Sequence, residues 1–393
     1  MRYLPLCELV EISPTVRLEK GVEYPFVPME DITPGRRYVQ ARQIRVASGG
    51  AKFGHGDTLF ARITPCLENG KIAQFVSVPG QIAFGSTEYW VFRARPKISD
   101  PAFVFYLASA DILRKPAEKS MAGASGRQRA DIAAVKDIEV PAPSLAIQQR
   151  IASILSAYDN LIENNARRIT ILEEMARRLY EEWFVHFRFP GHEQVRMVES
   201  ELGLIPEGWK VCGFTELFDV QYGKTLPTTN LNPDGEYPVY GGGGVIGRYQ
   251  SYVTSGPTCL ITSRGNGSGT VWRTVEKAFV TNNSFLVIPK GRFEGLGFGF
   301  AELFSKHIPI KSVLGGAAQP QLTLDALSSL RVLASSSPIA KAFDDLARPF
   351  FDLALTLHFK NTNLRAQRDL LLPKLISGEI DVSAFPEPEA VAA

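Results

Sequence analysis

Two long stretches of this chain carry apolar residues at the spacing of helices that pack side by side. In residues 144–190, apolar positions alternate in steps of four and three, beginning at Ile147, Ile151 and Ile154. That seven-residue repeat is typical of coiled coils. Prolines precede the stretch and Pro190-Gly191 marks its end, and both are helix boundary signals. The pattern therefore predicts a long helix over residues 144–190.

The same pattern returns 192 residues later, because Ile147 corresponds to Ile339 and Leu161 to Leu353. The second stretch again follows a proline, and it predicts a helix over residues 338–383. We expect the apolar positions of both stretches to line the contact between the helices, and we term them the predicted seam. These positions are Ile147, Ile151, Ile154, Tyr158, Leu161, Leu172, Leu179, Ile339, Phe343, Leu346, Phe350, Leu353, Leu364 and Leu371.

Both copies place a cation at the same point near the middle of the predicted helix. Arg168 and Lys360 occupy these equivalent positions. Long cationic side chains commonly carry their charge out to water. A contact with a partner or a phosphate is the alternative interpretation.

The segments before the two helices also resemble each other. LCELVEI at residues 6–12 matches FTELFDV at 214–220, and residues 121–144 parallel residues 314–337. An internal repeat of this length indicates two copies of one domain. We expect domains at 1–143 and 210–337, helices at 144–190 and 338–383, a linker at 191–209 and a disordered tail at 384–393.

Within each domain, short runs of β-branched and aromatic residues lie between Gly, Pro and Asn, as strands do. Helical patterns follow at about 101–114 and 294–306. Each domain is therefore expected to mix helices and strands, an α+β fold. The predicted strands are Leu59–Ile63, Ile72–Val76, Tyr89–Phe92, Cys259–Thr262 and Phe285–Ile288.

The two long helices are expected to pack on each other. Equivalent helices that bury equivalent surfaces pair about an approximate two-fold axis. We therefore expect an antiparallel coiled coil with pseudo-two-fold symmetry.

Length and composition agree with a folded chain of more than one domain. The 393 residues are too many for a single ordinary core, and 45% are hydrophobic, which excludes a disordered or collagen-like protein. No apolar run is long enough for a membrane span, and the first residues lack the apolar stretch of a secretory signal. We therefore expect a soluble, cytoplasmic protein. The four Cys and five His residues are scattered, so no metal site is predicted.

Basic residues concentrate in loops of the first predicted domain. Residues 1–143 hold 19 basic and 15 acidic residues, although the whole chain carries only +2. No acidic residue lies between Asp31 and Asp57, where five cations occur. Gly-rich basic loops suit phosphate contact, and Arg, Asn and Gln read base edges. Solvated loops have the same composition, and composition alone does not decide between the two. The candidate DNA-binding residues are Arg36, Arg37, Arg42, Arg45, Lys52, Arg62, Asn69, Lys71, Arg127, Gln128, Arg129, Tyr240, Arg248, Tyr249, Arg264, Asn266, Arg273, Asn282 and Asn283.

Patterns typical of enzymes are incomplete in this sequence. The Gly-Lys-Thr of residues 223–225 lacks the earlier glycine of a phosphate-binding loop. Asp57, Glu68 and Lys71 have the residue types of a metal-dependent nuclease, but Glu68 and Lys71 are three apart and would face opposite sides of a strand. No catalytic residue is therefore predicted.

Several stretches, taken in their order, resemble the specificity subunits of type I restriction-modification systems. They are PAPSLAIQQRIASILSAYDNLIENN, LEEMARRLYEEWFVHFRF, GDTLFARITPCLENGKIA, GSTEYWVFRA and LLPKLISGEID. The resemblance implies that the two domains are target-recognition domains, each reading one half of a bipartite, asymmetric site on double-stranded DNA. It implies that the helices set the spacing of the halves.

The resemblance also implies partners. Two methyltransferase subunits would dock on the helices, and a restriction subunit that translocates and cleaves DNA would join them. S-adenosylmethionine, ATP and Mg²⁺ would belong to these partners, and the chain itself would be non-catalytic. Two alternatives remain: an adaptor that binds methyltransferase subunits without reading DNA, and an independent metal-dependent nuclease.

Overall fold

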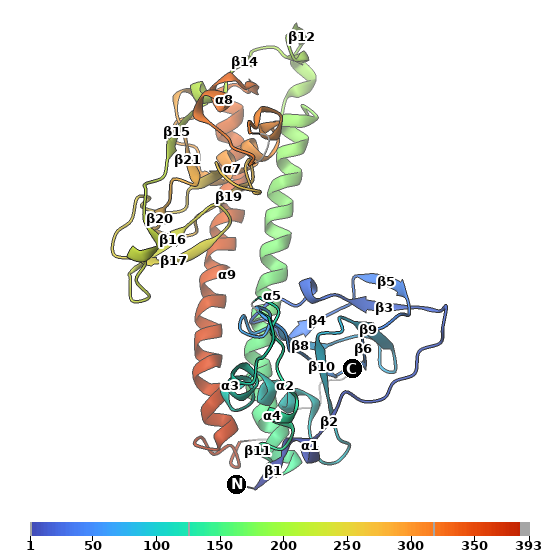
Figure 1. The fold of residues 1–393 in the computed structure, drawn as a ribbon. Helices are drawn as coiled ribbons and strands as arrows, with labels where there is room; N and C mark the ends of the chain where they lie inside the picture. Colours follow the sequence, from blue (N-terminus) through green and yellow to red (C-terminus); the bar gives the residue numbers. More distant parts are fainter. Residues whose placement is uncertain (1, 125, 317–318, 386–393) are drawn as a thin grey trace. The chain divides into compact units, whose positions relative to one another are not determined.

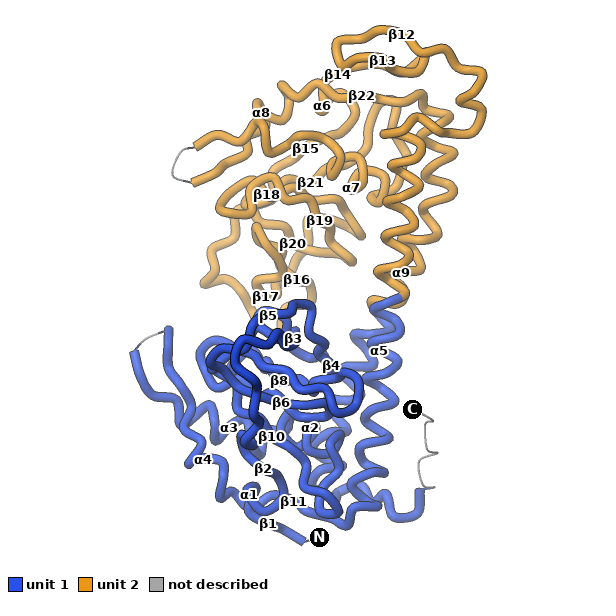
Figure 2. The backbone as a smooth tube through the Cα atoms, turned by 90° about the vertical axis from the view of Figure 1, so that its right-hand side faces the viewer, with its two compact units in different colours: residues 1–167, 359–393 blue, residues 168–358 orange. Residues whose placement is uncertain are grey.

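The computed structural model describes residues 2–124, 126–316 and 319–385, which form two compact units (Figure 2). Unit 1 comprises residues 1–167 and 359–393, and unit 2 comprises residues 168–358. Residues 386–393 of the predicted tail lie outside the described residues. The division falls within both long helices, so each unit contains part of each helix. The domain limits drawn from the sequence stay a prediction.

Unit 1 is built on two sheets. The larger sheet has the strand order β2-β10-β7-β8-β4, and the smaller has the order β5-β3-β9-β6. In the larger sheet, the strands are β2 (Val10–Ile12), β10 (Tyr89–Ala94), β7 (Thr58–Ala61), β8 (Ile72–Phe75) and β4 (Tyr38–Val39). In the smaller sheet, they are β5 (Gln43–Val46), β3 (Glu23–Val27), β9 (Ile82–Gly85) and β6 (Ala51–Gly54). The three strands predicted for this part of the chain are confirmed.

Short helices cover the larger sheet of unit 1. The start of α2 (Pro101–Ser109) is well defined by its sequence. The side chain of Asp100 accepts hydrogen bonds from the backbone N–H groups of Ala102 and Phe103, and Pro101 occupies the first turn of the helix. The helix predicted at 101–114 is in fact two helices that meet at Ala110. The short helices are α1 (Leu6–Leu9), α2 (Pro101–Ser109), α3 (Asp111–Lys119) and α4 (Ala133–Lys136). A pair of strands, β1 (Tyr3–Pro5) and β11 (Glu139–Pro141), joins the two ends of this domain.

Unit 2 repeats most of this topology, with one strand fewer in each of the two sheets. Its main sheet has the order β15-β21-β18-β19, all antiparallel, like β2-β10-β7-β8 in unit 1. Its second sheet, β17-β16-β20, pairs β16 in parallel with β20, just as β3 pairs in parallel with β9. The two sheets consist of β15 (Phe218–Tyr222), β21 (Ser284–Pro289), β18 (Cys259–Thr262), β19 (Val271–Arg273), β17 (Val245–Tyr249), β16 (Tyr237–Tyr240) and β20 (Phe279–Val280). The predicted repeat is thus present at the level of strand order.

The remaining elements of unit 2 close the domain and form a hairpin. A strand pair, β14 (Lys210–Gly213) with β22 (Arg331–Ala334), matches the pair β1 and β11 of unit 1. The predicted linker contains a hairpin of β12 (Met197–Ser200) and β13 (Gly203–Pro206). The helices are α6 (Phe214–Leu217), α7 (Phe298–Lys306) and α8 (Leu324–Ser329).

Two long helices, α5 (Leu145–Tyr180) and α9 (Ser337–Ser377), follow the two domains (Figure 1). A short π-helical segment, Glu181–Val185, continues α5. In unit 1, Asp159 of α5 contacts Arg368 of α9. Asn165, which comes later in α5, contacts Asn361, which comes earlier in α9. The two helices are therefore antiparallel in this unit. In unit 2, Tyr180 and Phe343 pack with ring centroids 5.6 Å apart.

The predicted seam is displaced by one residue from the positions that are buried. Leu161, Leu346 and Leu353 are exposed, with 52%, 53% and 39% of their surface accessible. The next residues, Ile162, Ala347 and Ala354, are buried. Ile151 and Phe343 are buried as expected, while Ile147, Ile154, Tyr158, Leu172, Leu179, Ile339, Phe350, Leu364 and Leu371 are partly buried. Arg168 and Lys360 are exposed, as the interpretation that their charges lie in water expects.

The displaced register puts polar residues inside the helix contact. In unit 1, the buried positions include Asp159, Asn361 and Arg368. Asn165 donates to the side-chain oxygen of Asn361 at 2.9 Å, and Asn361 donates to the carbonyl of Ile162 at 3.1 Å. Buried polar groups are stable only when they are hydrogen-bonded, and these bonds meet that need.

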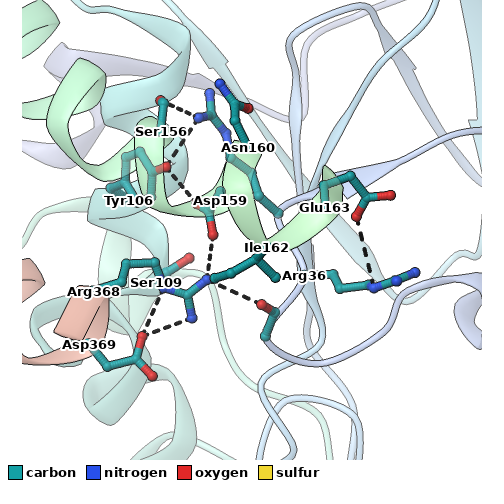
Figure 3. Close-up of polar contacts among 12 residues, drawn as sticks. Arg36, Tyr106, Ser109, Ser156, Asp159, Asn160, Ile162, Glu163, Arg368 and Asp369 are labelled. Carbon is teal, nitrogen blue, oxygen red and sulfur yellow. Dashed lines mark hydrogen bonds and ion pairs between the residues drawn. The ribbon is translucent and has the colours of Figure 1, made fainter. Parts of the chain in front are cut away.

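A polar network joins the parts of both long helices that lie in unit 1 to the mixed α/β domain of that unit (Figure 3). Asp159 on α5 forms an ion pair with Arg368 on α9 and accepts a hydrogen bond from the hydroxyl of Tyr106 at 2.6 Å. Arg37 donates to that hydroxyl, to Ser156 and to Gln74 on β8. Burial raises the pKa of Tyr106, so its hydroxyl stays protonated and can donate. The network fixes the segment before β4 against the helices.

Among the described residues, no helix is both long enough and apolar enough to cross a membrane.

The contact between α7 and α9 in unit 2 depends on a glycine. A side chain at Gly299 would overlap the ring of Phe351, which is itself buried. We expect Gly299→Ala to lower the unfolding free energy of unit 2 by about 1–3 kcal/mol, because overpacking forces the helices apart. Calorimetry of the full chain would measure the shift. Gly256→Ala is the control, since a side chain there meets nothing within 4 Å; equal effects of the two changes would contradict the expectation.

The charge pair in the unit 1 network gives a second prediction. Asp159→Ala leaves the buried guanidinium of Arg368 without its buried partner, and such a loss costs about 3–5 kcal/mol. Hydrogen exchange should rise in the segment around Arg37, which the same network holds. Asp369→Ala is the matched control, because its exposed carboxylate also pairs with Arg368 but adds at most about 1 kcal/mol. An Asp159→Ala protein as stable as the control would refute the role of the network.

Candidate nucleic-acid interface

Four of the candidate DNA-binding cations of unit 1 are exposed at its surface. Arg42 and Arg45 lie near and on β5, and Arg127 and Arg129 lie in the loop before α4. The guanidinium of Arg45 lies 4.1 Å from the ring centroid of Phe26, which restricts its orientation. Exposed arginines in loops can contact phosphates and base edges.

A second group surrounds a cavity of about 430 Å³ on unit 1. Lys52 on β6 and Arg62 after β7 line it together with Thr87, Tyr89 and Trp90. Both cations are half-buried, so their positions are better defined than those of free surface chains. Two positive charges facing a cavity edged by aromatic rings suit a nucleic-acid backbone or base.

Glu88 contacts two of the candidate DNA-binding residues, Arg62 and Arg129. Arg129 donates to Glu88 from Nε at 3.0 Å and from Nη2 at 2.7 Å, and Arg62 donates from Nε at 3.3 Å. The hydrogen bonds from Arg129 are the main reason why the pKa of Glu88 lies below its usual value. The carboxylate is therefore charged at neutral pH. Gln128 is half-buried; its carbonyl accepts from the backbone N–H of Thr64 at 3.0 Å, and its N–H donates to the hydroxyl of Thr64 at 2.9 Å.

Arg36 and Arg42 also line a cavity of about 280 Å³ with Tyr38, Glu163 and Arg167. Nε of Arg36 lies 4.0 Å from a carboxylate oxygen of Glu163 on α5 (Figure 3). Desolvation by burial raises the pKa of Tyr38, which keeps this hydroxyl neutral. The mixture of charges here is less suited to an anionic ligand than the cavity beside Lys52.

Arg37 is not available on this surface, because only 6% of it is accessible. Its guanidinium is taken up by the network with Tyr106, Ser156 and Gln74. The prediction of Arg37 as a surface contact is therefore corrected.

Two further candidates lie close to each other in the sequence. Nζ of Lys71 donates to the carbonyl of Met29 at 2.8 Å. Asn69 is exposed in the neighbouring turn.

In unit 2, the structure brings three predicted loops together. The side chain of Thr262 donates to the carbonyl of Gly242 at 2.7 Å, and the backbone N–H of Ser263 donates to the carbonyl of Asn283 at 2.8 Å. Arg264, Asn266 and Asn283 are exposed on these loops. Their amide and guanidinium groups are donors and acceptors that can read base edges.

Other predicted residues of unit 2 hold their own domain together. Arg248 is exposed, but it donates to the carbonyl of Gly235 at 2.6 Å. Tyr249 is half-buried against Phe279 at 5.3 Å, and Asn282 donates to Thr225 at 3.4 Å. These side chains shape the loops that carry the exposed ones.

Two predictions in unit 2 are corrected by burial. Tyr240 is 6% accessible and packs on Trp272 with ring centroids 5.5 Å apart. Arg273 forms ion pairs with Glu302 on α7 and Glu173 on α5, and burial covers most of its side chain. Both residues therefore stabilise unit 2 from within, and neither is placed to meet DNA at the surface.

The residues considered for a nuclease do not form a site. Asp57 is ion-paired with Arg93 at 2.6 Å, Glu68 is exposed and Lys71 is bonded to a carbonyl. Across the described residues, no group of three or more His, Cys, Asp and Glu side chains is placed to hold a metal ion. The four cysteines are free thiols.

The comparisons with known proteins agree with this description. A family model described as the type I restriction modification DNA specificity domain matches residues 10–174 and 206–346. The type I restriction enzyme MjaIX specificity subunit of Methanocaldococcus jannaschii is 25% identical over 67% of this chain and 66% of its own length. The MjaVIII specificity subunit of the same organism is 33% identical over 54% of this chain and 47% of its own length. The chain thus spans about half to two thirds of these relatives.

One solved structure has a comparable fold. The S subunit of a type I restriction-modification system from M. genitalium superposes with a TM-score of 0.55 at 18% identity, and the alignment covers 95% of this chain and 96% of that one. At this identity the likeness bears on the fold alone. Because the family model matches more than half of the chain, in two separate stretches, the chain belongs to the family of type I restriction modification DNA specificity domains.

Proposed function

We propose that this chain is the DNA-specificity subunit of a type I restriction-modification complex. The observation that carries the proposal is that the family model matches two stretches, on two domains whose main sheets have four strands in the same order. Each domain would read one half of a bipartite site. Because the exposed side chains of the two domains differ, the two half-sites would differ and the whole site would be asymmetric.

The exposed cations and amides supply the contacts in this proposal. In unit 1, Arg42, Arg45 and Arg127 are exposed, and Lys52 and Arg62 face a cavity. In unit 2, the exposed residues are Arg264, Asn266 and Asn283. The near-neutral charge of the chain implies little gain from counterion release, so partner subunits would contribute much of the affinity.

In this proposal, the partner subunits carry out the methylation and cleavage reactions. Two methyltransferase subunits would use S-adenosylmethionine, and a restriction subunit would use ATP and Mg²⁺. The complex would work in the cytoplasm, where its DNA lies. Exposed apolar side chains on the long helices, such as Ile171 and Met175 on α5, offer a surface on which methyltransferase subunits could dock.

A methylation assay tests the proposal directly. The purified chain is combined with its methyltransferase subunits, and random DNA is methylated and sequenced. We expect a consensus of two half-sites separated by unread base pairs. Complexes that form but methylate without any consensus would support the adaptor alternative and refute the proposal. DNA cleavage by the chain alone with Mg²⁺ would instead support the nuclease alternative.

The variant Arg264→Ala/Asn266→Ala serves as a marker in the same assay. It should relax one half-site only, since both residues lie in one loop of unit 2. Lys115→Ala, which removes an exposed cation of α3 paired with Asp111, is the matched control and should leave the consensus unchanged.

The second test concerns the spacer. Because a helix rises about 1.5 Å per residue, seven extra residues in both α5 and α9 lengthen each helix by about 10 Å, roughly three base pairs of DNA. Inserted at about residue 165 in α5 and about residue 361 in α9, one heptad in each keeps the buried faces aligned. We expect the methylated site to gain about three unread base pairs between unchanged half-sites.

The control places the same seven residues in the exposed turn at Gly80, where a side chain meets nothing within 4 Å. Methylated-site sequencing of that variant should return the original spacer. An unchanged spacer in the helix variant, with methylation retained, would show that the helices do not set the distance.

A further inference from the structure

The strongest unexplained arrangement on unit 1 is the contact of Glu88 with two arginines. The backbones of these three residues are tied to one another: the N–H of Arg62 donates to the carbonyl of Glu88 at 3.0 Å. The N–H of Ala130 donates to the carbonyl of Arg62 at 2.8 Å. Arg129 also exchanges two backbone hydrogen bonds with Ala122, at 2.9 and 3.1 Å. The loop that carries Arg129 is therefore fixed to the strand end that carries Arg62.

The side chain of Arg129 is held on one edge and open on the other. Glu88 binds the edge formed by Nε and Nη2, and in the described part of the chain no hydrogen-bond partner meets Nη1. The side chain of Arg129 is 52% accessible, whereas that of Glu88 is 15% accessible. The free edge of Nη1 and Nη2 thus faces solvent. That edge carries two parallel N–H donors, the fork that binds O6 and N7 of guanine bidentately.

An ordinary surface ion pair is the simpler explanation, and such pairs contribute little to stability. Two features argue for more. The carboxylate is mostly covered and is shared by arginines from two separate segments, so each guanidinium has a defined orientation. A defined orientation matters for base reading, because a bidentate contact depends on angle, whereas phosphate attraction does not.

We propose that Glu88 is a positioning residue that presents the free edge of Arg129 to a guanine in the half-site read by the first domain. The inference rests on the proposed function and names one base contact within it. Arg62 and Lys52, which line the adjacent cavity, would hold the neighbouring DNA backbone. Glu88 itself would act only through Arg129.

The test uses the full chain assembled with its methyltransferase subunits, and it compares the methylated consensus of three variants. Glu88→Gln keeps the size of the side chain but removes its charge. We expect roughly ten- to hundred-fold weaker discrimination at one G·C pair of one half-site, the range expected for a bidentate base contact. Arg129→Lys keeps a positive charge without the fork, so it should relax the same base pair. The other half-site, marked by the variant Arg264→Ala/Asn266→Ala, should be unchanged in both.

Glu118→Gln is the matched control, because Glu118 pairs with Arg114 on α3 of the same unit at 3.2 Å. It should leave every position of the consensus intact. Thermal unfolding of each complex checks that the variants are folded, and Arg129→Lys still tests the proposal if Glu88→Gln is unstable.

Several results would overturn the inference. One is an unchanged consensus in Arg129→Lys, which would make Arg129 at most a phosphate contact. Another is a loss of methylation in Glu88→Gln that is equal for all sequences, which would indicate a structural role alone. A first half-site without a G·C pair would exclude the guanine contact. Absence of any consensus in the unmodified complex would be the failure of the proposed function itself.

Discussion

The antiparallel packing of α5 on α9 in unit 1 is the contact on which the rest of that unit depends. Its centre is polar: Asp159 and Arg368 form a buried ion pair, and Tyr106 and Arg37 connect that pair to the domain. A buried charge pair is not a strong source of stability, but separating its partners is costly. A shift of one helix along the other would separate them, so the pair favours a single register.

This polar centre explains why the sequence predicted the two helices but not their register. Apolar residues such as Leu161 and Leu353 repeat at the right spacing, yet they are exposed, and Asp159, Asn361 and Arg368 lie inside. Counting apolar positions cannot find a contact built on charges and amides, since each polar residue is acceptable only with a partner from elsewhere in the chain. The repeat, the strand runs and the mixed α/β class needed only local patterns, and they were predicted.

At the candidate site, too, local sequence patterns predicted some features and missed others. Gly-rich basic stretches marked the loops, and Arg42, Arg45 and Arg264 are indeed exposed. Arg37 and Arg273 have the same residue type, but Arg37 is buried and Arg273 is mostly covered, because carboxylates, hydroxyls and amides distant in sequence bind them. The contact of Glu88 with Arg62 and Arg129 had no sequence signal, since these arginines lie 26 and 41 positions away and backbone pairing brings them together.

The two domains differ where a reading function would require it. Their main sheets have four strands in the same order, and the buried strands and the helix contact leave little freedom to vary. Their loops carry different groups: a glutamate that holds two arginines in unit 1, and exposed Arg264, Asn266 and Asn283 in unit 2. Loops tolerate such changes because their side chains are not part of the core. Two equal frameworks with unequal loops would favour two different half-sites, and that inequality is what an asymmetric DNA site demands of the subunit that reads it.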